Sequence, residues 1–352
     1  MLEKNFPAVS VIIPLFNAEK YIADCLKSLA NQTFQDFEIL IADDCSTDNS
    51  RAVVGNFYAQ FGDRLTLMTL SRNSGRPGIP RNFALAEARG KYVYFLDGDD
   101  VLTKTALEDL YRVAEDFDAD VVHCEKALSF NDADSKIKLQ TFSVQQGEFV
   151  TKPTLETFDT AERVTGFVNK KFLWWACNKL IRRKLLVDNN ILFPAVTMYE
   201  DFLFAFECLV TAKNYVRVPF AGYCYRLRND SLSHKTIHFD ESIDTLISVV
   251  NYAESFMLAQ KFFVDNPQYR YAVIDFFVQE RFDITENFFL ESPFDFGEIY
   301  DFLCKKVFSD KPEQNVALTS YLFIAANAFK IHAKRQAAEI AELKKQLGGK
   351  SK

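Results

Sequence analysis

The chain has 352 residues, of which 48% are hydrophobic and 25% are charged, and its formal net charge is −7 at pH 7. A chain of this size and apolar content can bury a core in one large domain or in two smaller ones. Its acidic balance argues against a general nucleic-acid-binding protein, which would carry a basic patch or stripe.

The cysteines and the apolar runs indicate the compartment. The chain has seven cysteines and no Cys-x-x-Cys pair, which is typical of reduced thiols in a cytoplasmic protein. Residues 1–8 lack the apolar segment of a secretion signal, and no apolar run is long enough to cross a bilayer. We therefore expect a cytoplasmic protein that is at most peripheral at the inner face of the plasma membrane.

From Val9 to about Lys126, short apolar runs alternate with amphipathic segments. Helical spacing predicts one helix after Asn17, a candidate cap, and another that ends before Gly90. The runs predicted to be strands are Val9–Ile13, Phe37–Ala42, Leu65–Leu70, Tyr92–Leu96 and Asp120–Cys124. This alternation predicts an α/β fold with a doubly wound, mostly parallel sheet.

The second half of the chain has a different pattern. Residues from about 131 to 165 are polar and lack a clean period, so we interpret them as a connecting or lid region. The apolar spacing of Phe172–Leu186 suits a helix or a helix pair, and another helix is predicted to begin near Glu200. After about Phe239 only helical periodicity remains, which predicts a helical C-terminal region.

The sequence Asp97-Gly98-Asp99-Asp100 follows the apolar run Tyr92–Leu96, where a buried strand is expected to end. The carboxyl ends of parallel strands are where open α/β folds bind ligands. Three carboxylates within four residues repel one another, and a divalent ion with oxygen ligands would offset that repulsion. The alternative is an acidic turn that caps the next helix, since Asp and Gly are favoured there for local reasons.

Three more polar segments lie at or near predicted strand ends. The segment Pro14–Asn17 contains no Gly-x-Gly-x-x-Gly, which argues against a dinucleotide-binding fold. In Ala42–Asp48, one carboxylate could accept the N3 proton of a uracil ring. The Gly/Pro-rich loop Asn73–Asn82 leads into a helix, where Arg81 could contact a pyrophosphate or be an ordinary solvated arginine.

In order and spacing, Val9–Asn17, Ala42–Asp48, Asn73–Asn82 and Phe95–Asp100 resemble the motifs of glycosyltransferase family 2. The resemblance covers about residues 8–126. It implies a GT-A fold and an inverting transfer from a nucleotide-diphosphate sugar, usually with Mn²⁺ or Mg²⁺. Residues 71–82 are particularly similar to bacterial members that decorate surface polymers such as wall teichoic acid.

By position in these motifs, the resemblance implies a donor site and a metal ligand. Asp99 is expected to coordinate the metal, while Asp100 only caps the next helix. The residues expected to bind the nucleotide or the donor sugar are Pro14, Phe16, Asn17, Asp44, Arg81, Asp97 and Gly98. Phe16 stands where the family often has Tyr and Cys45 where it often has Gly, and neither change removes a carboxylate.

The pair Glu200-Asp201 is similar to an acidic pair of the same family. An inverting transfer needs a base that takes the proton of the acceptor hydroxyl on the side of the sugar opposite the leaving diphosphate. By position Asp201 would be this base, and Glu200 would orient it or contact the acceptor. From these residues alone, two carboxylates favoured by the dipole at a helix N-terminus are an equal explanation.

Further segments resemble the acceptor half of the family. Trp174 and Trp175 could stack on a sugar ring or pack in the core. The segment Cys177–Arg183 includes Asn178 and Lys179, which are expected on the acceptor side, as is Arg226. In Tyr225–His234, which is similar to the closing loop of the family, His234 could reach the metal or the diphosphate, or be a lone surface histidine.

The sequence therefore predicts a transferase domain over residues 1–238, with a nucleotide-binding half at about 8–126 and an acceptor half at about 165–238. Residues 239–352 would serve acceptor binding, oligomerisation or membrane docking. The expected partners are a UDP-linked nucleotide-sugar donor and a glycan, polymer or lipid-linked acceptor. Two alternatives are a metal-dependent phosphoryl transferase, which lacks its usual motifs here, and a catalytically silent glycan-binding or scaffolding module.

Overall fold

The computed structural model describes residues 6–131, 140–142, 149–196, 198–228, 239–291, 334–342 and 344. The chain divides into two compact units, Met1–Thr236 and Ile237–Lys352. Among the residues just given, the first unit contains two sheets with helices, and the second contains helices only.

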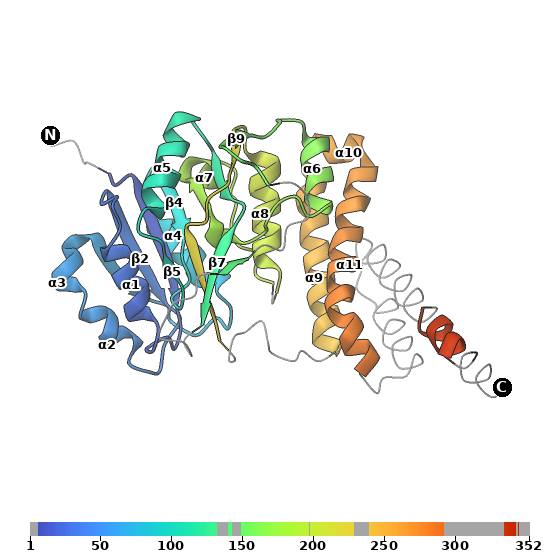
Figure 1. Cartoon of the computed structure of the whole chain (residues 1–352), viewed down its shortest axis with the longest axis horizontal. Helices are drawn as coiled ribbons and strands as arrows, with labels where there is room; N and C mark the ends of the chain where they lie inside the picture. Colours follow the sequence, from blue (N-terminus) through green and yellow to red (C-terminus); the bar gives the residue numbers. More distant parts are fainter. Residues whose placement is uncertain are drawn as a thin grey trace. The chain divides into compact units, whose positions relative to one another are not determined.

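In the described part of the first unit, eight strands form the main sheet in the order β3-β2-β1-β4-β10-β6-β11-β9. Figure 1 shows part of this unit, with β2 and β4 labelled near helices α1, α4 and α5. The strands β1 to β4 pair in parallel, and so do β6 and β11. Their bounds are β1 Val9–Leu15, β2 Phe37–Asp43, β3 Leu65–Thr69, β4 Tyr92–Phe95, β6 Val121–Cys124, β9 Thr154–Leu155, β10 Lys179–Arg182 and β11 Tyr215–Val218. The predicted mostly parallel sheet is confirmed, and each of the five predicted strands is present.

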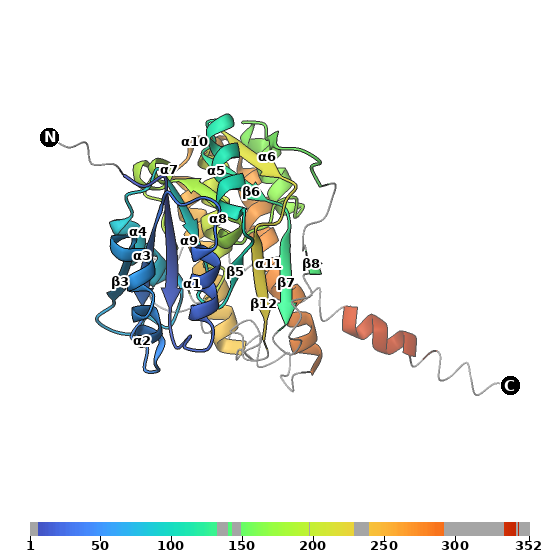
Figure 2. The ribbon, with the colours of Figure 1, turned by 60° about the vertical axis from the view of Figure 1, so that its left-hand side comes forward.

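A smaller sheet lies beside the main one, with the order β5-β12-β7-β8 in the described residues (Figure 2). Its strands are β5 Val101–Leu102, β7 Ala127–Asn131, β8 Gln140–Phe142 and β12 Tyr223–Leu227. Strand β12 pairs with β5, so residues after position 220 lie next to the segment that follows Asp100. Of the predicted connecting region, 132–139 and 143–148 lie outside the described residues; β8 and β9 fall within it, and the helix α6 begins there.

Helices cover both faces of the main sheet, as a doubly wound fold requires. One face packs on α1 and α5, through buried residues such as Leu26 and Leu110. The other face packs on α4 and α8, where Phe95 of β4 meets Phe204 with 5.6 Å between ring centroids. The helices of this unit are α1 Ile22–Ala30, α2 Ser50–Gly55, α3 Tyr58–Phe61, α4 Gly78–Glu87, α5 Ala106–Asp116, α6 Thr160–Val168, α7 Arg183–Asp188 and α8 Glu200–Thr211, with short 3-10 turns at Gly62–Arg64 and Ala176–Asn178.

The segment predicted as a helix or helix pair over Phe172–Leu186 is partly wrong. Lys179–Arg182 forms strand β10, which runs antiparallel between β4 and β6, and only Arg183–Asp188 is α-helical. Leu180 and Ile181 are fully buried between two strands, so pairing with the sheet overrides the helical spacing of the apolar residues. The helix predicted near Glu200 is confirmed as α8.

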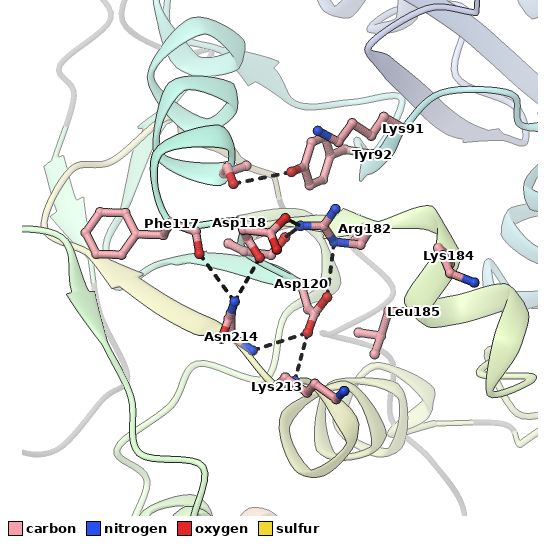
Figure 3. Close-up of polar contacts among 12 residues, drawn as sticks. Lys91, Tyr92, Phe117, Asp118, Asp120, Arg182, Lys184, Leu185, Lys213 and Asn214 are labelled. Atoms are coloured by element: carbon pink, nitrogen blue, oxygen red, sulfur yellow. Dashed lines mark hydrogen bonds and ion pairs between the residues drawn. The ribbon is translucent and has the colours of Figure 1, made fainter.

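Polar contacts at the end of the sheet where β6 begins fix the position of β10 (Figure 3). Arg182, the last residue of β10, donates from Nε to Asp120 at 3.1 Å and from Nη2 to Asp118 at 2.6 Å. The second Asp120 oxygen accepts from the backbone nitrogens of Lys213 and Asn214, at 2.8 and 3.2 Å. Asp120 therefore ties together the ends of β10, α8 and β11, away from the strand ends that carry the predicted site.

The second unit has helices α9 Phe239–Leu258, α10 Lys261–Asp265 and α11 Pro267–Glu291, and residues 334–342 are also helical. Helices α9 and α11 lie side by side and pack against each other (Figure 1). Both helices carry fully buried apolar residues, such as Val249 and Val250 on α9 and Val273 and Ile274 on α11. None of the helices in the described ranges combines the length and the apolar character needed to cross a bilayer.

Candidate active site

The acidic loop, residues 97–100, leaves β4 and closes against the end of β1. The backbone nitrogen of Leu96 donates to the carbonyl oxygen of Ile12 at 2.9 Å, which continues the pairing of the two strands. A methyl group added at Gly98 would lie only 3.3 Å from the carbonyl oxygen of Pro14. Glycine therefore allows the acidic loop to lie directly on the β1 terminus, and the structure brings together the predicted residues Pro14, Gly98 and the three carboxylates.

Each carboxylate of the acidic loop has its own partner. Asp97 pairs with Arg81 at 2.6 Å, and Asp99 pairs with Arg228 at 2.9 Å. Asp100 is buried and accepts hydrogen bonds from the Tyr223 hydroxyl and from the backbone nitrogen of Arg226. The prediction that Asp100 caps the next helix is wrong, because α5 begins only at Ala106 and Asp100 instead joins the acidic loop to β12.

Electrostatics in the acidic loop favour an added cation. Burial raises the pKa of Asp99, and the neighbouring Asp97 raises it further, while Arg228 opposes both effects. Burial and then Asp99 and Asp97 raise the pKa of Asp100 well above its usual range. The neighbouring arginine and hydrogen bonds thus offset the burial and mutual repulsion of these carboxylates only in part, and a bound cation would favour their ionised forms.

The donor set of the acidic loop suits a hard divalent cation. Asp97 and Asp99 are partly exposed, and carboxylate oxygens are the ligands that Mg²⁺ and Mn²⁺ prefer. No cluster of three or more His, Cys, Asp or Glu side chains that could hold a metal occurs in the part of the chain that the structure describes. An ion here would rely on one or two carboxylates plus oxygens of a bound phosphate, which is a common arrangement for Mg²⁺. His234 lies outside the described residues.

Arg226 does not face an acceptor, in contrast to the prediction. The residue is 4% exposed, and Nε donates to the Asp99 carbonyl oxygen at 2.7 Å. Its guanidinium lies 4.6 Å from the ring centre of Phe130 and pairs with Asp24 at 3.3 Å. Arg226 is enclosed because β12 is a strand of the smaller sheet, and its role is to hold the backbone of the acidic loop.

Arg81 also differs from the prediction. It was expected to contact a diphosphate, but its side chain is only 3% exposed. Its two terminal nitrogens donate to Asp97 at 2.6 Å and to Asp201 at 2.8 Å. Arg81 lies on the first turn of α4, which packs against the sheet, so its guanidinium lies between the acidic loop and the start of α8.

The pair Glu200-Asp201 begins α8, directly after Tyr199 in the left-handed region at φ 66°. Such a conformation is costly for a bulky residue and is found mostly where the surrounding structure fixes it. Burial and the charge of Asp201 raise the pKa of Glu200 to about 7. Burial also raises the pKa of Asp201, against the opposing effect of Arg81. This site therefore contains a carboxylate that can exchange a proton near neutral pH.

The residues predicted to contact the nucleotide lie at the ends of β1 and β2. Both oxygens of Asp44 accept from Ser74, from its backbone nitrogen at 2.7 Å and its hydroxyl at 2.8 Å. Asp44 thus anchors the Gly/Pro-rich loop, and its contact with uridine stays a prediction. Phe16, which follows β1, is 50% exposed, as a stacking residue would be. Asn17 is not a helix cap, because α1 begins at Ile22; it has φ 48° and its side chain accepts from Thr47.

On the predicted acceptor side, only the tryptophans are accessible. Trp174 stacks on Phe202 with ring centroids 4.1 Å apart, and Trp175 lies near Tyr225; both tryptophans are partly exposed. Asn178 and Lys179 are 0% exposed, so the prediction that they contact an acceptor is wrong for this structure. They face inward because Lys179 begins the central strand β10 and Asn178 donates to the Cys124 carbonyl oxygen at 2.8 Å.

Lys179 is buried and holds the backbone of a segment next to the site. Its ammonium donates to the carbonyl oxygens of Leu173 and Trp175, at 2.6 and 2.7 Å, and burial lowers its pKa to about 8. Ala176, which directly follows Trp175, has a backbone nitrogen that donates to Asp201 at 3.4 Å. Lys179 therefore fixes the segment that contacts Asp201.

Two residues that contact the carboxylates of the acidic loop, Tyr223 and Arg228, were not identified from the sequence. Tyr223 begins β12 and Arg228 directly follows it, and β12 meets the segment after the acidic loop in the smaller sheet. A signal for Arg228 was present, because Arg226 and Arg228 are two positions apart and residues at that spacing along a strand share a face. Tyr223 carried no comparable signal.

The chain is similar to known proteins over the part that contains this site. The model described as "Glycosyl transferase family 2" matches residues 10–188. The chain is 32% identical over 224 residues to the poly(ribitol-phosphate) beta-N-acetylglucosaminyltransferase TarS of Staphylococcus aureus, over 63% of this chain and 36% of TarS. It is 33% identical over 235 residues to the putative glycosyltransferase EpsH of Bacillus subtilis, over 64% of this chain and 62% of EpsH.

A solved structure is also similar. The crystal structure of S. aureus TarS 1–349 in complex with UDP-GlcNAc matches with a TM-score of 0.56 and 27% identity, over 77% of this chain and 80% of that chain. This match confirms the predicted GT-A-like fold. The chain spans about a third of the length of TarS.

Proposed function

Because the chain belongs to glycosyl transferase family 2, we propose that it transfers a sugar from a nucleotide-diphosphate sugar to a hydroxyl group of a bacterial surface glycan, polymer or lipid-linked precursor, with inversion at the sugar carbon. One observation carries this proposal most directly. Arg81 contacts Asp97 of the acidic loop and Asp201 of α8 with the same guanidinium, so the predicted donor site and the predicted base are neighbours.

In this proposal Asp201 is the general base and Glu200 is its partner. The acceptor hydroxyl loses its proton to the Asp201 carboxylate as its oxygen forms a bond to the sugar carbon. On the opposite face the bond from that carbon to the diphosphate oxygen breaks, and the nucleoside diphosphate leaves with the electron pair. Glu200, whose pKa is about 7, can then accept or relay the proton near neutral pH.

The donor is proposed to lie over the strand ends of β1, β2 and β4. Pro14, Phe16, Asn17 and Asp44 would contact the nucleoside, with the exposed Phe16 ring stacking on it. Asp97 and Gly98 would face the sugar phosphate. Asp99 would hold Mn²⁺ or Mg²⁺, whose chemistry when bound is to stabilise the charge that develops on the leaving diphosphate. Trp174 and Trp175 would support the acceptor.

We propose a UDP-linked hexose or N-acetylhexosamine as the donor, on the grounds of the similarity to TarS in complex with UDP-GlcNAc. A polymer acceptor fits the similarity to a poly(ribitol-phosphate) transferase. We further propose that residues 1–238 form the transferase domain, and that residues 239–352 serve acceptor binding, oligomerisation or membrane docking. The cytoplasmic location stays a prediction.

The test is donor turnover. Purified protein is incubated with Mn²⁺, a panel of UDP-sugars and poly(ribitol-phosphate), and release of UDP is measured. We expect release to fall at least about 100-fold in Asp201→Asn and Asp99→Asn, because each removes a carboxylate with a direct role. Asp116→Asn, an exposed aspartate at the end of α5, is the matched control and should behave like the unmodified protein.

Two outcomes would contradict the proposal. Equal UDP release from all variants would remove the assigned roles of Asp201 and Asp99. Binding of UDP and Mn²⁺ in calorimetry, without turnover on any acceptor of a broad panel, would favour the catalytically silent glycan-binding module instead.

A further inference from the structure

Arg81 makes its two ion pairs with carboxylates that are far apart in the sequence and close in space. Nη2 donates to Asp97 and Nη1 to Asp201, each within 2.8 Å, so one planar group links the loop after β4 to the first turn of α8. Nε, the third nitrogen, has no hydrogen-bond acceptor among the described residues. The two carboxylates are therefore the fixed points of this guanidinium.

The surroundings of Arg81 hold its side chain in place. Its guanidinium carbon lies 5.1 Å from the centre of the Phe193 ring. Asn82 and Phe193 exchange two hydrogen bonds, at 2.8 and 2.9 Å, and the Phe193 ring stacks on Phe204 with centroids 4.0 Å apart. An arginine packed against a fixed ring loses little further freedom when it binds two acceptors, which suits it to set a distance between them.

Several charged groups meet around Asp201. Arg81 of α4 and Lys179 of β10 favour its ionised form, and Asp97 of the acidic loop disfavours it. Glu200 precedes it on α8, and the buried Cys177 thiol lies within the field of its charge. Arg81 is the cation that pairs directly with Asp201 among these groups, so removing Arg81 would leave three neighbouring carboxylates facing one another.

We propose that Arg81 is a positioning residue of the transfer reaction: it holds the base Asp201 at a fixed place relative to Asp97 of the donor site, and it is not a ligand of the leaving diphosphate. This inference rests on the proposed function. It differs from the role that the sequence motif implied for Arg81, because it predicts that loss of Arg81 impairs the chemical step and leaves nucleotide binding nearly intact.

The feature to be tested is that the Arg81 guanidinium binds two carboxylates at once. Lysine keeps the positive charge but presents a single point of attachment, so it cannot reproduce two fixed contacts at once. Arg81→Lys therefore separates the effect of charge from the effect of geometry, while Arg81→Gln removes both. Arg112→Gln, in which an exposed arginine of α5 is changed, is the matched control.

The experiment measures three quantities on the full chain: the affinity for UDP with Mn²⁺ by calorimetry, kcat and KM for the donor, and the pH dependence of kcat. We expect Arg81→Gln to keep UDP affinity within about threefold, and to lower kcat about 100-fold, as is typical when a reacting group is displaced by about 1 Å. The acid limb of its pH profile should move to higher pH, since the cation that favours ionised Asp201 is gone. Arg81→Lys should restore the acid limb but recover less than a tenth of kcat.

Other results would overturn the inference. A fall of more than tenfold in UDP affinity with kcat preserved at saturating donor would make Arg81 a diphosphate ligand. Full kcat in Arg81→Lys would show that two simultaneous contacts from residue 81 are not needed. If Arg81→Gln does not fold, Arg81→Lys alone decides the question. Absence of turnover in the unmodified protein, with UDP still bound, would be a failure of the proposed function and not of the Arg81 contacts.

Discussion

Replacing Glu200 by Gln should make the protein more stable above pH 7 while it removes a proposed functional group. Burial and Asp201 raise the pKa of Glu200 from 4.5 to about 7, so between these values the folded protein holds a proton that the unfolded chain has lost. The free energy of unfolding therefore falls as pH rises through this window. A pKa difference of about 2.5 corresponds to about 3 kcal/mol. Glu200→Gln should remove this penalty, with a gain near zero at pH 4.5 and about 3 kcal/mol at pH 8.

The assay is urea denaturation at pH 4.5, 6 and 8, followed by tryptophan fluorescence. Both tryptophans of the chain, Trp174 and Trp175, lie in the unit that carries the site, so the signal reports on that unit. The control is Glu115→Gln. Burial acts to raise the pKa of Glu115, but hydrogen bonds from Lys91 and Tyr92 outweigh it and lower the pKa.

The two glutamates should therefore respond with opposite signs. Because the folded pKa of Glu115 is lowered, its contribution to stability is present above its unfolded pKa and is lost in acid, so Glu115→Gln should lose stability at neutral pH. A Glu200→Gln variant that is less stable than the unmodified protein at pH 8, or a gain that does not depend on pH, would refute the reasoning. Such a result would mean that Glu200 is stabilised in its ionised form.

Three further substitutions test other contacts. Gly90→Ala places a methyl group 2.5 Å from the backbone nitrogen of Ser10 and should lower the free energy of unfolding by about 2 kcal/mol in the same urea assay; an unchanged value would mean that β1 and β4 can separate freely. Lys179→Met leaves buried carbonyl oxygens without a donor and should lower the free energy of unfolding by about 2 kcal/mol. An unchanged free energy of unfolding would contradict the supporting role of Lys179. Arg228→Gln removes the cation that pairs with Asp99, so the affinity for Mn²⁺ without nucleotide should rise in calorimetry; a lower affinity would count against Asp99 as the ligand.

The sequence was sufficient to predict the parts of the fold in which local pattern and final environment agree. Runs such as Val9–Ile13 are apolar apart from Ser10 because β1 is buried on both faces, and turn residues follow them. The positions of Pro14, Asp97 and Gly98 followed from the same logic, since parallel strands end at one edge of a sheet. Strand β10 could not be predicted in this way. Its apolar residues have helical spacing, and only the neighbours β4 and β6 determine that it is extended.

The partners of the site residues were less predictable than their positions. A motif that identifies Arg81 as functional cannot say whether its guanidinium faces a ligand or two carboxylates, because Asp97 and Asp201 come from elements 16 and 120 residues away. The partners of Lys179 could not be predicted for the same reason. It is polar and yet 0% exposed, because its ammonium donates to the backbone carbonyl oxygens of Leu173 and Trp175. In both cases the residue type was informative about chemistry, and burial decided which atoms it serves.

In the acidic loop, the sequence pattern and the contacts made in the fold together determine what each carboxylate does. Taken alone, the run from Asp97 to Asp100 is compatible with an ordinary acidic turn. In the structure its three carboxylates are not equivalent: Asp100 is buried beside β12, Asp97 is linked through Arg81 to Asp201, the proposed base, and Asp99 is paired with Arg228. Only Asp97 and Asp99 keep exposed surface, so a donor and its ion can reach the loop through these two residues. Because Asp97 shares its cation with Asp201, any ligand that interacts with the charge of Asp97 also changes the electrostatic surroundings of Asp201, the proposed base. The arrangement therefore connects donor binding to the residue that would accept the proton.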